Sequence, residues 1–148
     1  MSAADNAAAV QAVNDAFNAR DVNAAIALST PDVETINMAT GERFTGPDGL
    51  RQFFTGWTTA FPDGKVETVS ITADEQSAVI EFTGRGTQTG PLHSPSGDIP
   101  PTDRSTEIHF VSVDEFQQGK ISRTRLYFDA LGLMVQLGVI PAPARTQA

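Results

Sequence analysis

An aspartate near the C-terminus, Asp129, has the sequence setting of an acid/base catalyst. It ends a predicted strand over 120–129 and stands directly before a predicted helix over 130–138. A carboxyl group held against a partly dehydrated pocket has a raised pKa, which suits it to take up and return a proton. The same position also fits the N-cap of the following helix, where a carboxylate accepts a backbone hydrogen bond. The two roles are compatible with each other.

The predicted strand that ends at Asp129 alternates between two sets of side chains. One set contains Ile121, Arg123, Arg125, Tyr127 and Asp129, and the other contains Ser122, Thr124, Leu126 and Phe128. Parity alone does not say which set faces the interior. If the first set lines a cavity, Arg125 and Asp129 lie on one wall about 13 Å apart, with Tyr127 between them. Arg125 and Tyr127 are therefore candidate substrate-binding residues.

Two residues of the neighbouring predicted strands could contribute polar groups to the same cavity. Gln88 ends the apolar, glycine-containing face of the strand over 77–90, where it could donate or accept a hydrogen bond; an exposed amide at the strand end is the alternative. His109 lies among valines in the strand over 105–117, where a buried histidine with satisfied hydrogen bonds is the more common case.

Asn37 and Trp57 are further candidates for the pocket wall. Asn37 lies near the end of a predicted strand over 33–38. Trp57 belongs to the broad aromatic face of a helix that Gly46-Pro47 begins and Phe61-Pro62 ends.

Composition excludes several other kinds of site. Cysteine is absent, and His93 and His109 are the only imidazoles, so a thiol catalyst is ruled out and no metal site is expected. Lys and Arg total 10 against 18 Asp and Glu, and the net charge of -8 disfavours nucleic acid as a partner. No apolar run approaches the ~20 residues that span a bilayer, and no signal peptide is evident, so we expect no membrane association and a cytoplasmic location.

The order of the predicted elements favours an α+β fold. Helices occupy the first 28 residues, Pro31 ends the second of them, and strands follow over 33–38, 65–73, 77–90, 105–117 and 120–129. A proline-rich loop over 91–104 is long for a hairpin connection. We expect one domain over 1–148, with 141–148 as a frayed tail, in which a curved sheet and the helices across it enclose a pocket.

Several short motifs resemble the SnoaL-like polyketide cyclases, or ester cyclases, of the nuclear transport factor 2-like superfamily. The motifs keep the family's order and spacing over roughly 80 residues, and the N-terminal helices suit the superfamily. They are Phe61-Pro62-Asp63, Gly86-Thr87-Gln88-Thr89-Gly90-Pro91, Ile99-Pro100-Pro101-Thr102, Gly119-Lys120-Ile121, and Tyr127-Phe128-Asp129 leading to Gln136-Leu137-Gly138.

The resemblance implies a cone-shaped, cystatin-like roll that forms a homodimer through its sheet and binds a hydrophobic small molecule. It also implies cofactor-free, metal-free acid/base catalysis of an aldol-type ring closure by the acid at position 129. The sequence departs from the family at Gln88, where histidine is frequent, and at Arg123 and Arg125, where glutamate and tryptophan are common. These departures imply a more cationic pocket and a substrate that carries a carboxylate or an enolate.

Two other functions remain open at this point. One is a different acid/base enzyme, either an isomerase or an epoxide hydrolase. The epoxide hydrolase would need a second pocket carboxylate beside Asp129, and Glu107 is the obvious candidate. The other is a non-catalytic ligand-binding or dimerisation module, in which Asp129 only caps a helix.

Overall fold

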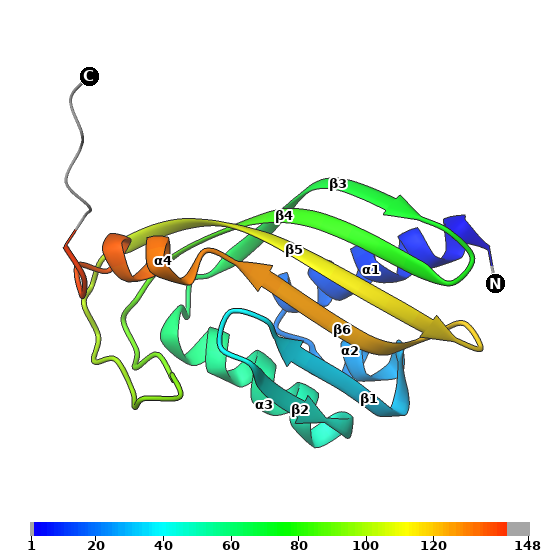
Figure 1. Ribbon diagram of the computed structural model, residues 1–148, viewed down its shortest axis with the longest axis horizontal. Helices are drawn as coiled ribbons and strands as arrows, with labels where there is room; N and C mark the ends of the chain where they lie inside the picture. Colours follow the sequence, from blue (N-terminus) through cyan, green and yellow to red (C-terminus); the bar gives the residue numbers. More distant parts are fainter. Residues whose placement is uncertain (1, 142–148) are drawn as a thin grey trace.

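The computed structural model describes residues 2–141, so the predicted tail over 141–148 lies almost wholly outside the described residues (Figure 1). Four helices and six strands follow one another along this part of the chain. Their order is α1 (Ala3–Asn18), α2 (Val22–Ala27), β1 (Ser29–Asn37), β2 (Glu42–Thr45), α3 (Gly46–Ala60), β3 (Lys65–Ala73), β4 (Ser77–Thr87), β5 (Ser105–Gln117), β6 (Lys120–Phe128) and α4 (Ala130–Gln136).

The six strands form one mixed sheet in the order β2-β1-β6-β5-β4-β3. Neighbouring strands are antiparallel except β1 and β6, which run parallel although most of the chain separates them. The predicted α+β class is therefore confirmed, with two helices before the first strand, one after β2 and one after β6.

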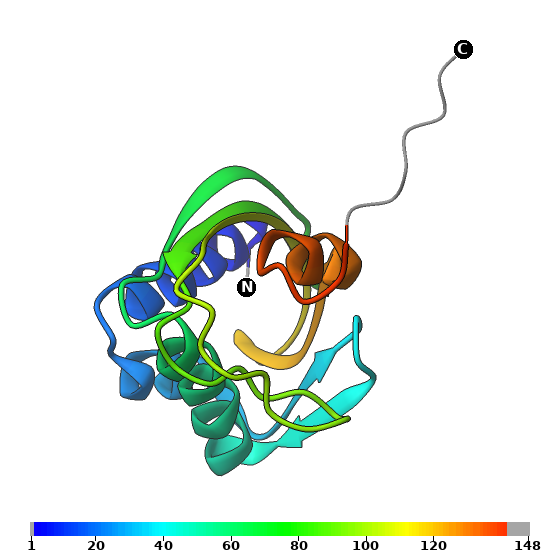
Figure 2. The same cartoon turned by 90° about the vertical axis from the view of Figure 1, so that its left-hand side faces the viewer.

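The sheet curves into an arc without closing, and the helices cover its concave side. Viewed from the end that carries α4, α1, α2 and α3 occupy the open side of the arc (Figure 2). Within residues 2–141, no helix has the length and hydropathy needed to cross a membrane.

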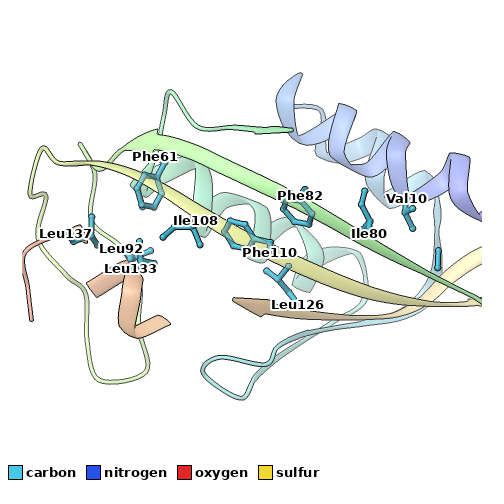
Figure 3. Close-up of a cluster of buried hydrophobic side chains, with 12 residues drawn as sticks. Val10, Phe61, Ile80, Phe82, Leu92, Ile108, Phe110, Leu126, Leu133 and Leu137 are labelled. Carbon is cyan, nitrogen blue, oxygen red and sulfur yellow. The ribbon is translucent and has the colours of Figure 1, made fainter. Parts of the chain in front are cut away.

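Buried side chains fill the concave side in two clusters. The larger one extends from Val10 of α1, past Ile80 and Phe82 of β4, to Leu133 of α4 (Figure 3). The smaller one joins Leu50 and Phe54 of α3 to the first two helices. These contacts fix the helices over the sheet and leave a cavity between them.

Local signals explain most of the helix boundaries. Ser2 and Asp5 form a capping box at the start of α1, with the Ser2 hydroxyl accepting from the Asp5 amide at 3.0 Å. Pro47 lies in the first turn of α3, where its missing N–H leaves no intrahelical hydrogen bond unmade. Gly138 follows the end of α4 with a φ of 75°, a backbone conformation that glycine adopts readily.

The largest differences from the predicted strand boundaries are at the start of β1 and at the end of β4. Strand β1 begins at Ser29 and includes Pro31, because its pairing with β6 is interrupted between Ser29 and Glu34, where a proline lacking an N–H is tolerated. Strand β4 ends at Thr87, before the predicted residue 90, because Gln88 pairs with the loop that leads into β5.

Candidate ligand pocket

The concave side of the sheet and the helices across it enclose an apolar cavity of about 140 Å³. Its wall includes the aromatic rings of Phe53, Phe54, Trp57, Phe61, Phe82 and Phe110. A cavity of about 150 Å³ holds one benzene ring, whereas pockets for drug-sized ligands span about 300–1,000 Å³. The hollow therefore fits one six-membered ring, and a larger ligand requires some of these side chains to move.

Trp57 is the centre of the aromatic wall. Its ring meets Phe110 edge-on at a centroid distance of 5.6 Å and Phe128 at 5.4 Å. Phe110 in turn stacks on Phe82 at 5.1 Å. Gly84 makes room for this arrangement, because a Cβ at that position would lie 2.8 Å from the Phe110 ring. Such rings favour a flat, unsaturated ligand.

Polar side chains gather at one part of this wall, and we call Ser112, Asp114, Thr124 and Thr35 the polar corner. All four line the cavity. Asp114 of β5 is paired with Thr124 of β6, which is paired with Thr35 of β1, so three of the residues form one row across three adjacent strands. Neighbouring strands are about 4.8 Å apart, which places the Thr35 and Asp114 backbones about 10 Å from each other.

The Asp114 carboxyl group is the one acid in the cavity wall among the described residues. It is 4% exposed, and it accepts hydrogen bonds from Thr124 Oγ1 at 2.5 Å and from Ser112 Oγ at 3.1 Å. Burial raises the pKa of Asp114 to about 6, against the lowering effects of the two hydroxyl groups and of the Arg125 charge. At neutral pH the group is mostly ionised, and its conjugate acid is accessible.

Thr35 completes the corner with a hydroxyl group that lacks a partner. The residue is 1% exposed, and Thr35 Oγ1 makes no hydrogen bond within the described part of the chain. Buried hydroxyl groups without a partner are uncommon because each loses its hydrogen bonds to water. This group faces a cavity in which a ligand atom could supply the missing bond.

Asp129 lies outside this wall. Its side chain is exposed, and Asp129 Oδ1 accepts a hydrogen bond from the Gly132 amide at 2.8 Å, which makes it the N-cap of α4. Asp129 does not line the cavity, and the position as a helix cap, which the sequence also allowed, is the one observed. Whether Asp129 also takes part in a reaction is a separate question.

Arg125 and Tyr127 lie on the convex face of the sheet, away from the cavity. Arg125 Nη1 binds Glu115 Oε2 at 2.6 Å, and Tyr127 is 41% exposed. The interior face of β6 instead carries Ile121, Thr124 and Leu126. The positive charge expected from Arg123 and Arg125 is therefore not supplied to the cavity, because neither residue lines it.

Gln88 is buried but belongs to the loop instead of the cavity. Its side-chain amide donates to the carbonyl oxygens of Gly90, Ile99 and Pro100, and its Oε1 accepts from Thr102 Oγ1 at 2.8 Å. The residue is 0% exposed, so neither the predicted pocket contact nor the alternative of an exposed amide describes it. Gln88 holds the 88–102 segment in shape.

The remaining predicted residues divide between the two sides of the sheet. Trp57 lines the cavity. Asn37 is buried, but its Oδ1 accepts from the amides of Ala39 and Thr40 in the turn after β1. His109 is exposed on the convex face beside Thr83. It therefore lies neither in the pocket wall nor in the buried setting that the sequence suggested as the more common case. Glu107 is paired with Arg85 on that same face, which leaves the epoxide hydrolase without its second carboxylate.

Asp114 is the pocket residue that the sequence reasoning missed. A usable signal exists in the alternation of strand 105–117, because Ile108, Phe110 and Ser112 share one face and Asp114 is the next residue on it. Extending the apolar face by one step places a carboxyl group inside. Across residues 2–141, no three His, Asp or Glu side chains converge as metal ligands.

Comparison with known proteins decides the family. The sequence profile of the SnoaL-like polyketide cyclases matches residues 7–137. The chain belongs to the SnoaL-like polyketide cyclase family. The resemblance in its motifs is thereby confirmed, although no curated protein matches the sequence.

Solved structures of similar shape agree with the SnoaL-like fold. AclR from Streptomyces galilaeus is 24% identical with a TM-score of 0.81, and the match covers 97% of this chain and 87% of AclR. A protein of Jannaschia sp. CCS1 assigned to the SnoaL-like polyketide cyclases is 18% identical with a TM-score of 0.82, covering 93% and 94% of the two chains. TerC, crystallised with polyporic acid, is 18% identical with a TM-score of 0.69, covering 90% and 98%. At these identities the likeness establishes the fold alone.

Proposed function

We propose that this SnoaL-like protein binds a hydrophobic ring compound in the apolar cavity and converts it by cofactor-free acid/base chemistry of the cyclase or isomerase type. The observation that carries the proposal is an aromatic cavity with one buried carboxyl group in its wall. Membership of the SnoaL-like family supports the reaction class. TerC was crystallised with an acidic organic compound, which is consistent with a small-molecule ligand for this fold.

A ring of matched size tests whether the cavity binds ligands. We expect 4-fluorotoluene to bind, because each Å² of apolar ring surface that the cavity removes from water contributes about 25 cal/mol of favourable free energy. Fluorine NMR measures the affinity. The Val13→Phe variant should abolish binding by filling the cavity, whereas Val69→Phe, at a position 58% exposed, should leave it unchanged. Equal binding by both variants would exclude the cavity as the site.

A more specific form of the proposal gives the proton transfer of an aldol-type cyclisation to Asp129. The family resemblance and its position directly after β6 support this role. The carboxylate also caps α4, so a substrate would have to approach the beginning of that helix. Because serine can cap a helix but cannot exchange a proton in the same way, Asp129→Ser separates the two functions.

The ligand that fits this site is an enolisable or enolic compound more readily than a carboxylate. The expectation of a carboxylate depended on Arg123 and Arg125, and both side chains are engaged by acidic partners on the convex face. An anionic group would also meet the Asp114 carboxylate. An enol or a ketone that forms an enolate transiently avoids this repulsion.

We further propose a homodimer that forms through the convex face of the sheet. Val79 and Tyr127 are exposed there, and Val111 and Val113 lie between them on β5. The helices α1 to α3 all lie on the concave side, so this apolar strip has no cover from them (Figure 2). A second copy of the chain would bury it.

A further inference from the structure

The polar corner combines two features that a purely structural site would avoid. A buried carboxylate in an apolar wall destabilises the fold unless it is well paired, and Asp114 has two hydroxyl donors but no buried cation. On the far side of Thr124 in the same row, with its backbone about 10 Å from that of Asp114, Thr35 has a buried hydroxyl group with no partner among the described residues. A ligand in the cavity that offers a proton donor to Asp114 and an acceptor to Thr35 would satisfy both.

We propose that the polar corner binds the hydroxyl or carbonyl oxygen of a neutral ring compound, with Asp114 exchanging a proton with the ligand and Thr35 donating a hydrogen bond to its oxygen. This inference rests on the proposed use of the cavity. It assigns a proton-exchanging group that is separate from Asp129, which lies about 17 Å away along the strand direction, because Asp129 is five residues beyond Thr124, the partner of Asp114.

The proton transfer needs no additional reactant. The Asp114 carboxylate removes a proton from the carbon beside a carbonyl group, the C–H electron pair moves into a C=C bond, and the carbonyl oxygen becomes the enolate oxygen that Thr35 stabilises. Return of the proton to a different carbon gives an isomer. Attack of the enolate on a second carbonyl group within the same molecule gives an alkoxide, which recovers the proton from Asp114 and completes a ring.

The buried setting of Asp114 suits this exchange. Ser112 and Thr124 orient its two oxygens, and burial holds its pKa close to neutrality, so both protonation states are accessible. Arg125 on β6 is the charged side chain that acts on it, from the opposite face of the sheet. A neutral ligand with an O–H or an acidic C–H group is therefore preferred, and a permanent anion is rejected.

A pair of probes of equal size tests the binding part. We expect 4-fluorophenol to bind about tenfold more tightly than 4-fluorotoluene at pH 7.5, because only the phenol can donate to an ionised carboxylate. Fluorine NMR titrations give both affinities in one experiment. Failure of both probes to bind would overturn the proposed ligand pocket, whereas equal affinities would leave the pocket in place and overturn the polar corner.

Three variants test which residues cause the preference for 4-fluorophenol over 4-fluorotoluene. Asp114→Asn and Thr35→Val should each reduce the phenol preference to about threefold or less. Thr30→Val is the matched control, since Thr30 belongs to the same strand and its Oγ1 is also buried without a partner in the described residues, but Thr30 does not line the cavity. An equal effect of Thr30→Val and Thr35→Val would overturn the assignment of Thr35.

Deuterium exchange tests the proton transfer without a known substrate. We expect the wild-type protein to accelerate exchange at the carbons beside the carbonyl group of cyclohexanone in D₂O, with a rate that rises through pH 6 as Asp114 ionises. Asp114→Asn should lower this exchange rate at least tenfold, whereas the surface control Asp15→Asn should leave the rate unchanged. Absence of exchange by the wild type, or loss of exchange in Asp129→Ser with the full rate in Asp114→Asn, would overturn the role of Asp114.

Discussion

At the scale of single residues, the burial of Asp114 links its proposed role to a cost in stability. The carboxyl group is 4% exposed, and its two hydrogen-bond donors do not offset the loss of water, so its pKa stays raised at about 6. An acid of this kind binds its proton more tightly in the folded state than in the unfolded chain. Stability is therefore greatest when the group is protonated, and it falls as the pH rises between about 4 and 6.

Asp114→Asn should remove this pH dependence. Between pH 4 and pH 7, the free energy of unfolding of the wild type should fall by up to about 3 kcal/mol relative to that of the variant. The Asp114 pKa is raised by about two units, and each unit corresponds to about 1.4 kcal/mol. Urea unfolding at the two pH values measures the difference. Parallel pH profiles for the two proteins would show that Asp114 does not titrate with a raised pKa.

At the scale of secondary-structure elements, Asp129 shows how one residue can end a strand and begin a helix. It follows β6 directly, and its carboxylate fixes the first turn of α4 through the Gly132 amide. Leu133 of that helix reaches the cavity wall. The cap therefore contributes to the shape of the pocket even without contact with a ligand.

Replacing Asp129 should separate these effects. Asp129→Ala should lower the free energy of unfolding by about 1 kcal/mol through the loss of the cap, and Asp129→Ser should retain most of it. Denaturant unfolding and cyclohexanone exchange are then measured on both variants. Full exchange activity in Asp129→Ser would exclude Asp129 as an acid/base group and leave it a helix cap.

The sequence was a good guide to elements and to the pocket-facing side of β4, and a poor one to β6. Ile80 and Phe82 alternate with more polar residues along β4, so their burial follows from the two-residue period of a strand. On β6, the pairing advances two residues between Arg123 and Ile121 while β5 advances only one, from Glu115 to Phe116. Such a bulge reverses the alternation, which separates Ile121 from the set in which simple parity placed it.

The polar residues chosen from the sequence show a second reason why the polar corner was not predicted. Gln88 looked like a pocket residue because it ends an apolar face, but five hydrogen bonds within the loop satisfy its side chain. Four of those bonds join Gln88 to residues 11 to 14 positions away, and the sequence next to Gln88 does not indicate them. Asp114, in contrast, follows from the local alternation of its own strand.

At the scale of the whole molecule, the convex face gives a prediction about assembly. We expect a dimer in sedimentation equilibrium experiments, because Val79, Val111, Val113 and Tyr127 form an uncovered apolar strip on three adjacent strands. Tyr127→Glu should shift the protein to monomer, since a charge would be buried in the interface. The exposed Val69→Glu on β3 is the control, and a monomeric wild type would contradict the proposal.

The parallel pairing of β1 with β6 has a consequence for how the molecule is made. Hydrogen bonds from Lys120 to Ala27 and from Ile121 to Leu28 join segments separated by more than ninety positions. Closing so large a loop is slow, and it comes late during synthesis because β6 emerges near the end. Thr35 on β1 and Thr124 on β6 meet only then, so the proposed polar corner cannot form until the last strand has docked.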